Sequence, residues 1–265
     1  MPEDVAYLDC AASMPVRPEA VAELTRVLTE LPGNPSGAHA AARAARRTLD
    51  DARDVLADAL GCGPGDVVFT SGGTEADNLA VLGSTEPGEV VVASAVEHPA
   101  VRDAAARRDV RRAPVDRAGR VDLDTLADLL DEDVRLVTVM AVNNEVGTIQ
   151  PLSDVAGLVR ERAPRAVLHT DAVSRAAGLA HLCFPGVEAE ALLFLLDQAG
   201  VAASAASSCA SGAAEPSAVL AAMGVPRELA MGSLRLSLGW ATTDADVDRA
   251  LEAVPAAAAQ LRRPR

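Results

Sequence analysis

The chain has 265 residues, of which 49% are hydrophobic and 2% aromatic, and its formal net charge is −14. This length is enough for one large domain, or a large and a small one, with a sizeable core, and the composition excludes an intrinsically disordered chain. The negative charge disfavours binding to nucleic acid and to anionic membrane surfaces.

Two features of the composition bear on chemistry. All 24 lysine-plus-arginine positions are arginine, so the chain contains no lysine; a bias toward GC-rich codons is one explanation. The four cysteines form no CxxC pair and have no zinc-ligand spacing, so neither a metal site nor a disulfide framework is predicted. No leader-like or membrane-spanning run of apolar residues is present, and we expect a soluble cytoplasmic protein.

Strands and helices alternate through the first two thirds of the chain. Helical patterns cover 17–31 and 38–60, and a helix follows the glycine-rich turn at 71–73 and ends near Leu82. Further helices are predicted at 98–108, 122–130 and 153–162, and buried strands at 66–70, 89–93, 110–115, 135–141 and 166–170. This alternation predicts an α/β fold with a mostly parallel sheet covered on both faces, and ligands in such folds bind beyond the carboxyl ends of the strands.

The pattern changes after Asp171. Helices are predicted at 188–198 and 217–223, a half-exposed strand at 234–238, and a last helix at 244–261 interrupted at Pro255. We interpret this part as a smaller α+β module. The predicted division is a large domain at 1–182, with an N-terminal arm, and a small domain at 183–265 that carries a cysteine loop.

Several predicted strands and turns are followed by polar residues suited to ligand binding. Gly73 and Thr74, in Ser-Gly-Gly-Thr-Glu, open a helix after a strand and could hold a phosphate, although Gly-Gly is often a plain turn. His98 could stack on a flat ring or cap a helix. Asn144 could bind a ligand or belong to a turn, and Asp171 could hold a protonated ring nitrogen or cap a helix.

Two residues nearer the C-terminus have reactive or charged side chains. Cys209 lies in a loop of small residues, Ser-Ser-Cys-Ala-Ser-Gly, where a cysteine is either a nucleophile or a spectator thiol. Arg235 lies in the predicted strand at 234–238, where a buried guanidinium requires a carboxylate partner. That partner is either a substrate or an acidic residue of the protein.

Taken in order, these segments resemble the cysteine desulfurases, which belong to aminotransferase class V and to fold type I of the pyridoxal-phosphate enzymes. The resemblance covers both ends of the family's chain. The matching stretches are YLDCAAS (7–13), GNPSGAH (33–39), VVFTSGGTEADNLA (67–80), VEHPAV (96–101), VNNEVGTIQP (142–151), HTDAV (169–173), FPGVEAEALL (184–193), SSCASG (207–212), EPSAVLAAMG (215–224) and GSLRLSLG (232–239).

The resemblance implies a role for each matching residue. Gly73 and Thr74 would hold the phosphate of pyridoxal 5'-phosphate, and His98 would stack on its ring. Asn144 would bind the ring hydroxyl, Asp171 would pair with the ring nitrogen, and Ser174 stands where the family usually has a cofactor-binding glutamine. Arg235 and Asn34 would hold the carboxylate of L-cysteine, and Cys209 would take the sulfur as a persulfide.

The family's partners and assembly follow from the same resemblance. Cysteine desulfurases are homodimers that release alanine and pass sulfur to an acceptor, such as an iron–sulfur scaffold or a sulfur carrier protein. Here we expect a homodimer, or a heterodimer with an intact paralogue. No metal, nucleic acid or membrane partner is expected.

One departure from the family pattern is chemical. The family carries its Schiff-base lysine between the segments that match HTDAV and FPGVEAEALL, and here only ten residues separate them. The first interpretation is therefore a cysteine desulfurase whose chain is internally deleted and inactive alone. The second is a non-catalytic partner, decoy or sulfur relay that pairs with an intact desulfurase. The third is an enzyme that works without lysine and uses His98 or another base.

Overall fold

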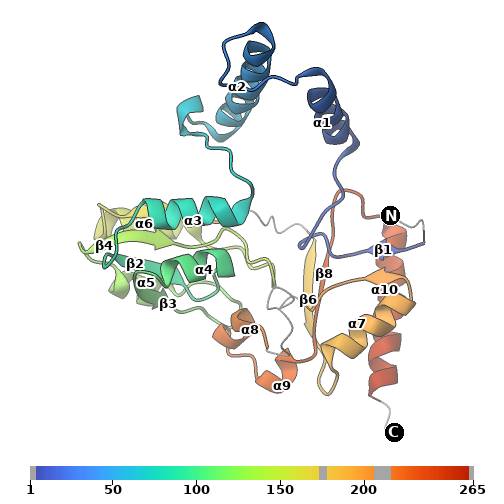
Figure 1. Cartoon of the computed structure of the whole chain (residues 1–265). Coiled ribbons are helices and arrows are strands. Elements are labelled where there is room, and N and C mark those ends of the chain that lie inside the picture. The colour runs from blue at the N-terminus through green and yellow to red at the C-terminus, as the bar shows by residue number, and fades with distance from the viewer. Residues whose placement is uncertain (1–3, 173–177, 206–215, 263–265) are drawn as a thin grey trace. The chain divides into compact units, whose positions relative to one another are not determined.

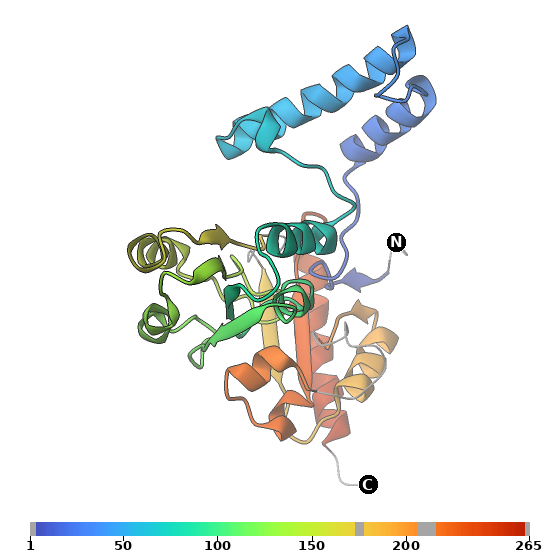
Figure 2. The same ribbon diagram turned by 60° about the vertical axis from the view of Figure 1, so that its left-hand side comes forward.

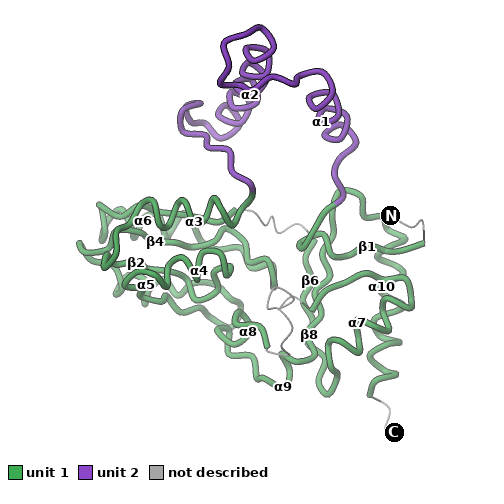
Figure 3. The backbone as a smooth tube through the Cα atoms, viewed as in Figure 1, with its two compact units in different colours: residues 1–14, 72–265 green, residues 15–71 purple. Residues whose placement is uncertain are grey.

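The structure is a computed structural model that describes residues 4–172, 178–205 and 216–262. The chain forms two compact units, shown in different colours in Figure 3. The first comprises residues 1–14 and 72–265, and the second comprises residues 15–71. The predicted domain boundary between residues 182 and 183 is a different division, and it stays a prediction.

A four-stranded parallel sheet lies at the centre of the first unit. Its strand order is β3-β2-β4-β5, and each strand is joined to the next in sequence by a helix. The predicted parallel α/β sheet is confirmed. The elements are α3 (Gly73–Gly83), β2 (Val90–Ser94), α4 (Pro99–Ala105), β3 (Asp109–Ala113), α5 (Leu123–Leu129), β4 (Val134–Thr138), α6 (Leu152–Arg162) and β5 (Val167–His169).

Helices cover both faces of this sheet (Figure 2). All five residues of β2 are buried, and their side chains alternate between the two faces. Val91 and Ala93 pack against α3 and α4, whereas Val90 and Val92 pack against α5 and α6. Burial on both faces explains why β2 is apolar from Val90 to Ala93, with no polar alternation.

The rest of the first unit forms a second core (Figure 1). Its two-stranded sheets are the parallel pair β1–β7 and the antiparallel pair β6–β8, and helices α7 and α10 pack with them. Leu192 and Leu196 of α7 and Val254 of α10 are buried in this core. The elements are β1 (Ala6–Tyr7), β6 (Leu179–Cys183), α7 (Ala189–Gln198), β7 (Val201–Ala202), α8 (Ala218–Ala222), α9 (Arg227–Ala230), β8 (Ser233–Ser237) and α10 (Asp244–Leu261).

The second unit consists of two helices and a short 3₁₀ turn, α1 (Pro18–Glu30), α2 (Ala40–Leu60) and η1 (Pro64–Asp66). No residue of α1 is buried, and Ala42 and Ala57 are the buried residues of α2. His39 caps the start of α2 by accepting a hydrogen bond from the Ala42 N–H, and Gly61 ends it in a left-handed conformation with φ of 70°.

Three expectations about these elements were wrong. The apolar run at 66–70 is not a buried strand: Val68 is 66% exposed, and no strand among the described residues pairs with the run. An apolar run becomes a strand only where a neighbouring strand accepts its backbone hydrogen bonds. The last helix continues through Pro255 because Leu251, whose carbonyl loses its helical partner, lies on the exposed side. The strand β8 is largely buried and not half-exposed.

The sequence patterns missed the strands β1, β6 and β7. Two of them have only two residues, and β6 (Leu179-Ala-His-Leu-Cys183) contains no β-branched or aromatic residue. Within the described ranges, no helix combines the length and the apolar composition that a membrane span requires.

Candidate cofactor and substrate site

The residues predicted to bind a phosphate begin helix α3. Gly72 precedes the helix in an extended conformation with φ of 162°, and Gly73 and Thr74 are its first two residues. The N–H groups of a helix's first turn have no partner within the helix and favour an anion. Gly73 and Thr74 therefore lie where a phosphate could be bound by backbone N–H groups and a hydroxyl.

His98 lies at the start of α4 and caps that helix. Its Nδ1 accepts a hydrogen bond from the Ala100 N–H at 3.2 Å, so the helix-cap interpretation is confirmed. The ring is also part of the wall of a pocket of about 480 Å³, together with Thr74 and Asn78 of α3. The first turns of α3 and α4 thus open on one pocket, and stacking of His98 on a ring stays a prediction.

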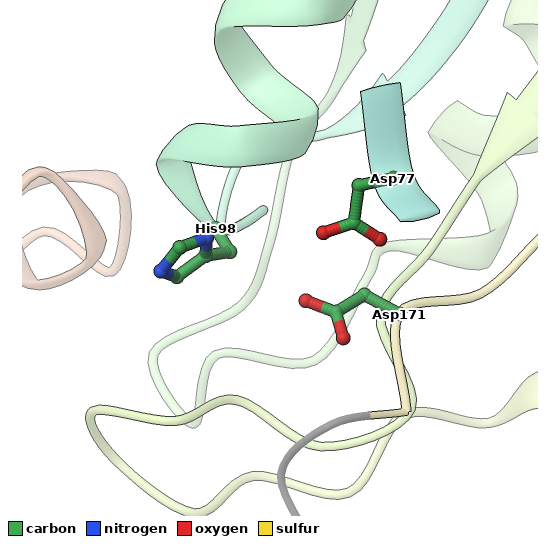
Figure 4. A group of neighbouring side chains, drawn as sticks. All are labelled: Asp77, His98 and Asp171. Atoms are coloured by element: carbon green, nitrogen blue, oxygen red, sulfur yellow. The ribbon is translucent and has the colours of Figure 1, made fainter. Parts of the chain in front are cut away.

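Two carboxylates lie beside His98. Asp171 follows β5, Asp77 comes from α3, and both are buried (Figure 4). A carboxylate oxygen of Asp77, a carboxylate oxygen of Asp171 and a ring nitrogen of His98 all lie within 4.8 Å of one another. Burial, together with the charge of Asp171, raises the pKa of Asp77 to about 6. The pair therefore concentrates negative charge that a cation, such as a protonated ring nitrogen, would stabilise.

Although their atoms are close together, these three side chains are not oriented as a set of three metal ligands. The lone pair of His98 Nδ1 already accepts a hydrogen bond from the Ala100 N–H, so this nitrogen is not available to bind a metal ion. The other ring nitrogen points away from both carboxylates in Figure 4. The cluster as it stands offers two carboxylates next to a ring.

Glu97 and His169 complete the electrostatic environment and were not identified from the sequence. Glu97 accepts a hydrogen bond from the Met140 N–H at 2.7 Å, and burial raises its pKa to about 8. Among the described residues, its other oxygen, Oε2, is buried without a hydrogen-bond partner, which disfavours a charged carboxylate. His169 lies 3.6 Å from Asp77, and burial lowers its pKa, so that it is neutral at neutral pH.

Arg235 in β8 is paired within the protein. Its guanidinium donates to Asp9 Oδ1 at 2.8 Å and to the Asn144 carbonyl at 2.9 Å, and the residue is 3% exposed. An acidic residue of the protein, one of the two partners that the sequence left open, is therefore present. Its Nε has no partner in the part of the chain that the structure describes. Binding of a substrate carboxylate to this arginine stays a prediction.

The loop from Asn143 to Gly147 joins the two cores of the first unit. Asn143 is fully buried, and its side chain bonds the Val96 carbonyl and the N–H groups of Glu145 and Val146. His181 of β6 lies 2.9 Å from the Glu145 carbonyl, and the Ser217 hydroxyl donates to the Glu145 carboxylate. Asn143 is thus structural, and binding of a ligand by the Asn144 side chain stays a prediction.

Three predicted site residues are not among the described residues of the first unit. Asn34 belongs to the second unit, where its Oδ1 accepts a hydrogen bond from the Ser36 N–H. Cys209 and Ser174 lie outside the described residues. Their roles stay predictions. Among the missed residues, Glu97 and His181 had a sequence signal, since each is a titratable residue within or beside an apolar run.

Comparisons with known proteins identify the family. The description Aminotransferase class-V matches residues 6–181. The IscS-like cysteine desulfurase of Mycobacterium tuberculosis is 33% identical over 384 aligned positions, which span 98% of each chain. The cysteine desulfurase IscS of Methanosarcina thermophila is 29% identical over 375 positions, spanning 97% of this chain and 92% of the relative.

Solved structures share the fold. A NifS-like protein has a TM-score of 0.84 with 23% identity, covering 97% of this chain and 99% of that one. The structure of SspA in complex with cysteine has a TM-score of 0.76 with 20% identity and covers 88% of this chain. These likenesses show a pyridoxal-phosphate fold of type I. The chain therefore belongs to the cysteine desulfurase family of aminotransferase class V, a family that depends on pyridoxal phosphate.

Proposed function

We propose that this chain is a cysteine desulfurase-like protein that binds pyridoxal phosphate without a covalent bond and does not release sulfur from L-cysteine by itself. The observation that carries the proposal is the absence of lysine from all 265 residues. The reaction needs an amine on the protein to anchor the cofactor and to move the α-proton of the substrate. Arginine does not replace it, because its guanidinium stays protonated.

The remaining residues fit the cofactor's non-covalent contacts. Gly73 and Thr74 would bind its phosphate at the first turn of α3, and Asn144 its ring hydroxyl. Asp171 would pair with the ring nitrogen, and the burial and the charge of Asp171, which together raise the pKa of Asp77 to about 6, support a cationic group there. His98 would lie against the ring, and Ser174 would take the role of the cofactor-binding glutamine that the family usually has. When bound, the cofactor withdraws electrons from the bond that breaks.

Two observations support an internal deletion as the reason why the chain has no lysine for the cofactor. An alignment of 384 positions over a chain of 265 residues leaves more than one hundred positions without a residue of this chain. The sheet is also short on one side: β5 at its edge has three residues, and Val167 is 50% exposed. Strands missing beyond β5 would leave such an apolar edge uncovered.

The substrate half of the site would be that of a desulfurase. Arg235, with Asn34, would hold the carboxylate of L-cysteine, and Cys209 would receive the sulfur and pass it to an acceptor protein such as an iron–sulfur scaffold or a sulfur carrier. SspA, a protein of the same fold, has been solved in complex with cysteine. A soluble cytoplasmic homodimer, or a heterodimer with an intact paralogue, is the assembly proposed.

A second function is a non-catalytic partner of an intact desulfurase. The Asp9–Arg235 ion pair favours it, because the guanidinium that should receive the substrate carboxylate is already neutralised at 2.8 Å. A substrate would have to displace Asp9 from a position where the arginine side chain is 4% exposed.

The test is cofactor trapping together with turnover. Purified protein is incubated with pyridoxal phosphate and borohydride, and mass spectrometry maps the adducts. We expect none on any internal residue, cofactor that is removed by dialysis, and alanine formation from L-cysteine no faster than with free cofactor. Asp171→Ala should weaken reversible binding about ten- to a hundredfold, the value of a hydrogen bond to a charged group.

A cofactor adduct on an internal side chain, or alanine formation above the background, would contradict the proposal. The M. tuberculosis relative provides the positive control. Sequencing the gene again across the codons for residues 171–184 tests the deletion separately, because a recovered lysine-bearing segment would restore the ordinary enzyme.

A further inference from the structure

The loop of residues 143–147 carries Asn144, whose side chain is predicted to bind the ring hydroxyl of the cofactor. On the side of the four-stranded sheet, the buried side chain of Asn143 donates to the Val96 carbonyl at 3.0 Å. On its other side, the loop contacts strands β6 and β8 of the second core. The position of Asn144 therefore depends on both cores of the first unit.

Two side chains from neighbouring strands hold successive carbonyls of this loop. Arg235 of β8 donates to the Asn144 carbonyl at 2.9 Å, and His181 Nδ1 of β6 lies 2.9 Å from the Glu145 carbonyl. Arg235 and His181 are directly opposite each other in the antiparallel β6–β8 pair, so their side chains project from the same face of this sheet. One pair of opposite residues thus restrains two successive peptide groups.

The histidine ring makes its contact with the loop in one defined tautomer. Because a carbonyl oxygen can only accept, His181 Nδ1 carries the proton. Burial lowers the pKa of His181, so at neutral pH the ring is neutral and Nε2 has a lone pair. Among the described residues, Nε2 is buried without a hydrogen-bond partner. A buried polar atom without a partner destabilises a fold, so packing of the sheet alone does not account for a histidine here.

Packing keeps the loop close to β6 independently of His181. A Cβ at Gly147 would lie 3.4 Å from the Cβ of Leu179 in β6, and the Ser217 hydroxyl donates to the Glu145 carboxylate. Apolar packing is not directional, whereas a hydrogen bond is. The contacts from His181 and Arg235 therefore determine how the peptide groups of the loop are turned.

We infer that His181 is a positioning residue: by holding the Glu145 carbonyl next to the Arg235–Asn144 contact, it orients the Asn144 side chain toward the ring hydroxyl of pyridoxal phosphate. This inference rests on the non-covalent cofactor binding proposed above. Without a lysine in the chain, non-covalent contacts alone hold the cofactor. Displacement of one hydrogen-bonding group then lowers the affinity directly, because binding groups depend on the residues that support them.

The experiment compares two ligands by equilibrium dialysis, pyridoxal phosphate and 3-deoxypyridoxal phosphate, which lacks the ring hydroxyl. His181→Leu should weaken binding of pyridoxal phosphate about five- to tenfold, roughly the value of one hydrogen bond. It should leave the affinity for the deoxy analogue unchanged. His181→Asn should keep the wild-type affinity for both ligands, because its amide N–H can donate to the Glu145 carbonyl in place of Nδ1. A general loss of folded structure would weaken both ligands equally.

A control variant and a measurement without ligand complete the test. Leu182→Ala changes the next residue of β6, a leucine that is 41% exposed, and should leave both affinities unchanged. In the cofactor-free protein, amides of residues 143–147 should exchange faster in His181→Leu than in the wild type or in His181→Asn.

Several results would overturn the inference alone: a wild type that binds both ligands equally well, a leucine variant that matches the wild type or weakens both ligands equally, or an asparagine variant that behaves as the leucine variant does. A wild type that binds neither ligand would overturn the proposed function and this inference with it.

Discussion

Three carboxyl groups lie close together near the first turns of α3 and α4, and all three are buried. Asp77, Glu97 and Asp171 are each less than one tenth exposed, and the charges of Asp77 and Asp171 add to the effect of burial on Glu97. Three negative charges in one buried place destabilise the fold, so protonation of Glu97 and of Asp77 relieves that cost. The stability of the protein without cofactor should therefore depend on pH in a defined window.

Glu97→Gln tests this at the residue level. The folded state raises the pKa of Glu97 to about 8 from an ordinary value of 4.5, so it holds an extra proton between these pH values. The free energy of unfolding of the wild type should therefore fall as pH rises through this window. The variant cannot ionise, so it should lose this part of the dependence and exceed the wild type at pH 8 by on the order of 2–4 kcal/mol.

Urea unfolding at pH 5 and at pH 8 provides the measurement. The exposed Glu161 gives a control, since its replacement by glutamine should leave the pH profile unaltered. Equal wild-type and Glu97→Gln stabilities at pH 8 would mean that Glu97 is not buried as described.

At the level of the elements, two glycines of the first unit differ in the space that surrounds them. Gly157 lies inside α6, and a Cβ there would meet nothing within 4 Å. Gly232 lies just before β8, and a Cβ there would be 2.2 Å from the carbonyl oxygen of Phe184. The first position tolerates a side chain, and the second does not.

Alanine substitutions should separate the two positions. Gly157→Ala should raise the free energy of unfolding by about 0.5–1 kcal/mol, because glycine is a poor helix former. Gly232→Ala should lower it by about 1–3 kcal/mol, because the backbone between β6 and β8 must move. Urea unfolding of both variants checks the pair, and a stabilised Gly232→Ala variant would refute the close approach.

Sequence patterns predicted elements best where the sheet is covered on both faces. The strand β2 and the helices α3 to α6 were located within a few residues, because their apolar periodicity is determined by packing on both faces of the sheet. The run at 66–70 has the same apolar character, yet none of the described strands pairs with it. Local composition cannot show whether a partner strand exists elsewhere in the chain.

For the whole molecule, the two units differ in how many of their residues are buried. No residue of α1 is buried, whereas β2 is buried throughout. Helices with few buried contacts open locally at low free-energy cost. Amides of α1 and α2 should therefore exchange with solvent at least a hundredfold faster than those of β2 and β4. Hydrogen-exchange mass spectrometry measures this directly, and equal protection of α1 and β2 would show that α1 is covered in solution.

The order of the motifs along the sequence was enough to predict the family, the parallel α/β sheet and the absence of a lysine for the cofactor, since residue identity and order determine all three. Only the tertiary structure revealed the pairing of Arg235 with Asp9, residues 226 positions apart, the gathering of Asp77 and Asp171 beside His98, and the hydrogen bond from His181 to the Glu145 carbonyl. Such contacts depend on which distant segments the fold brings together. A local pattern contains no record of them, because burial and charge are properties of the surroundings and not of the residue.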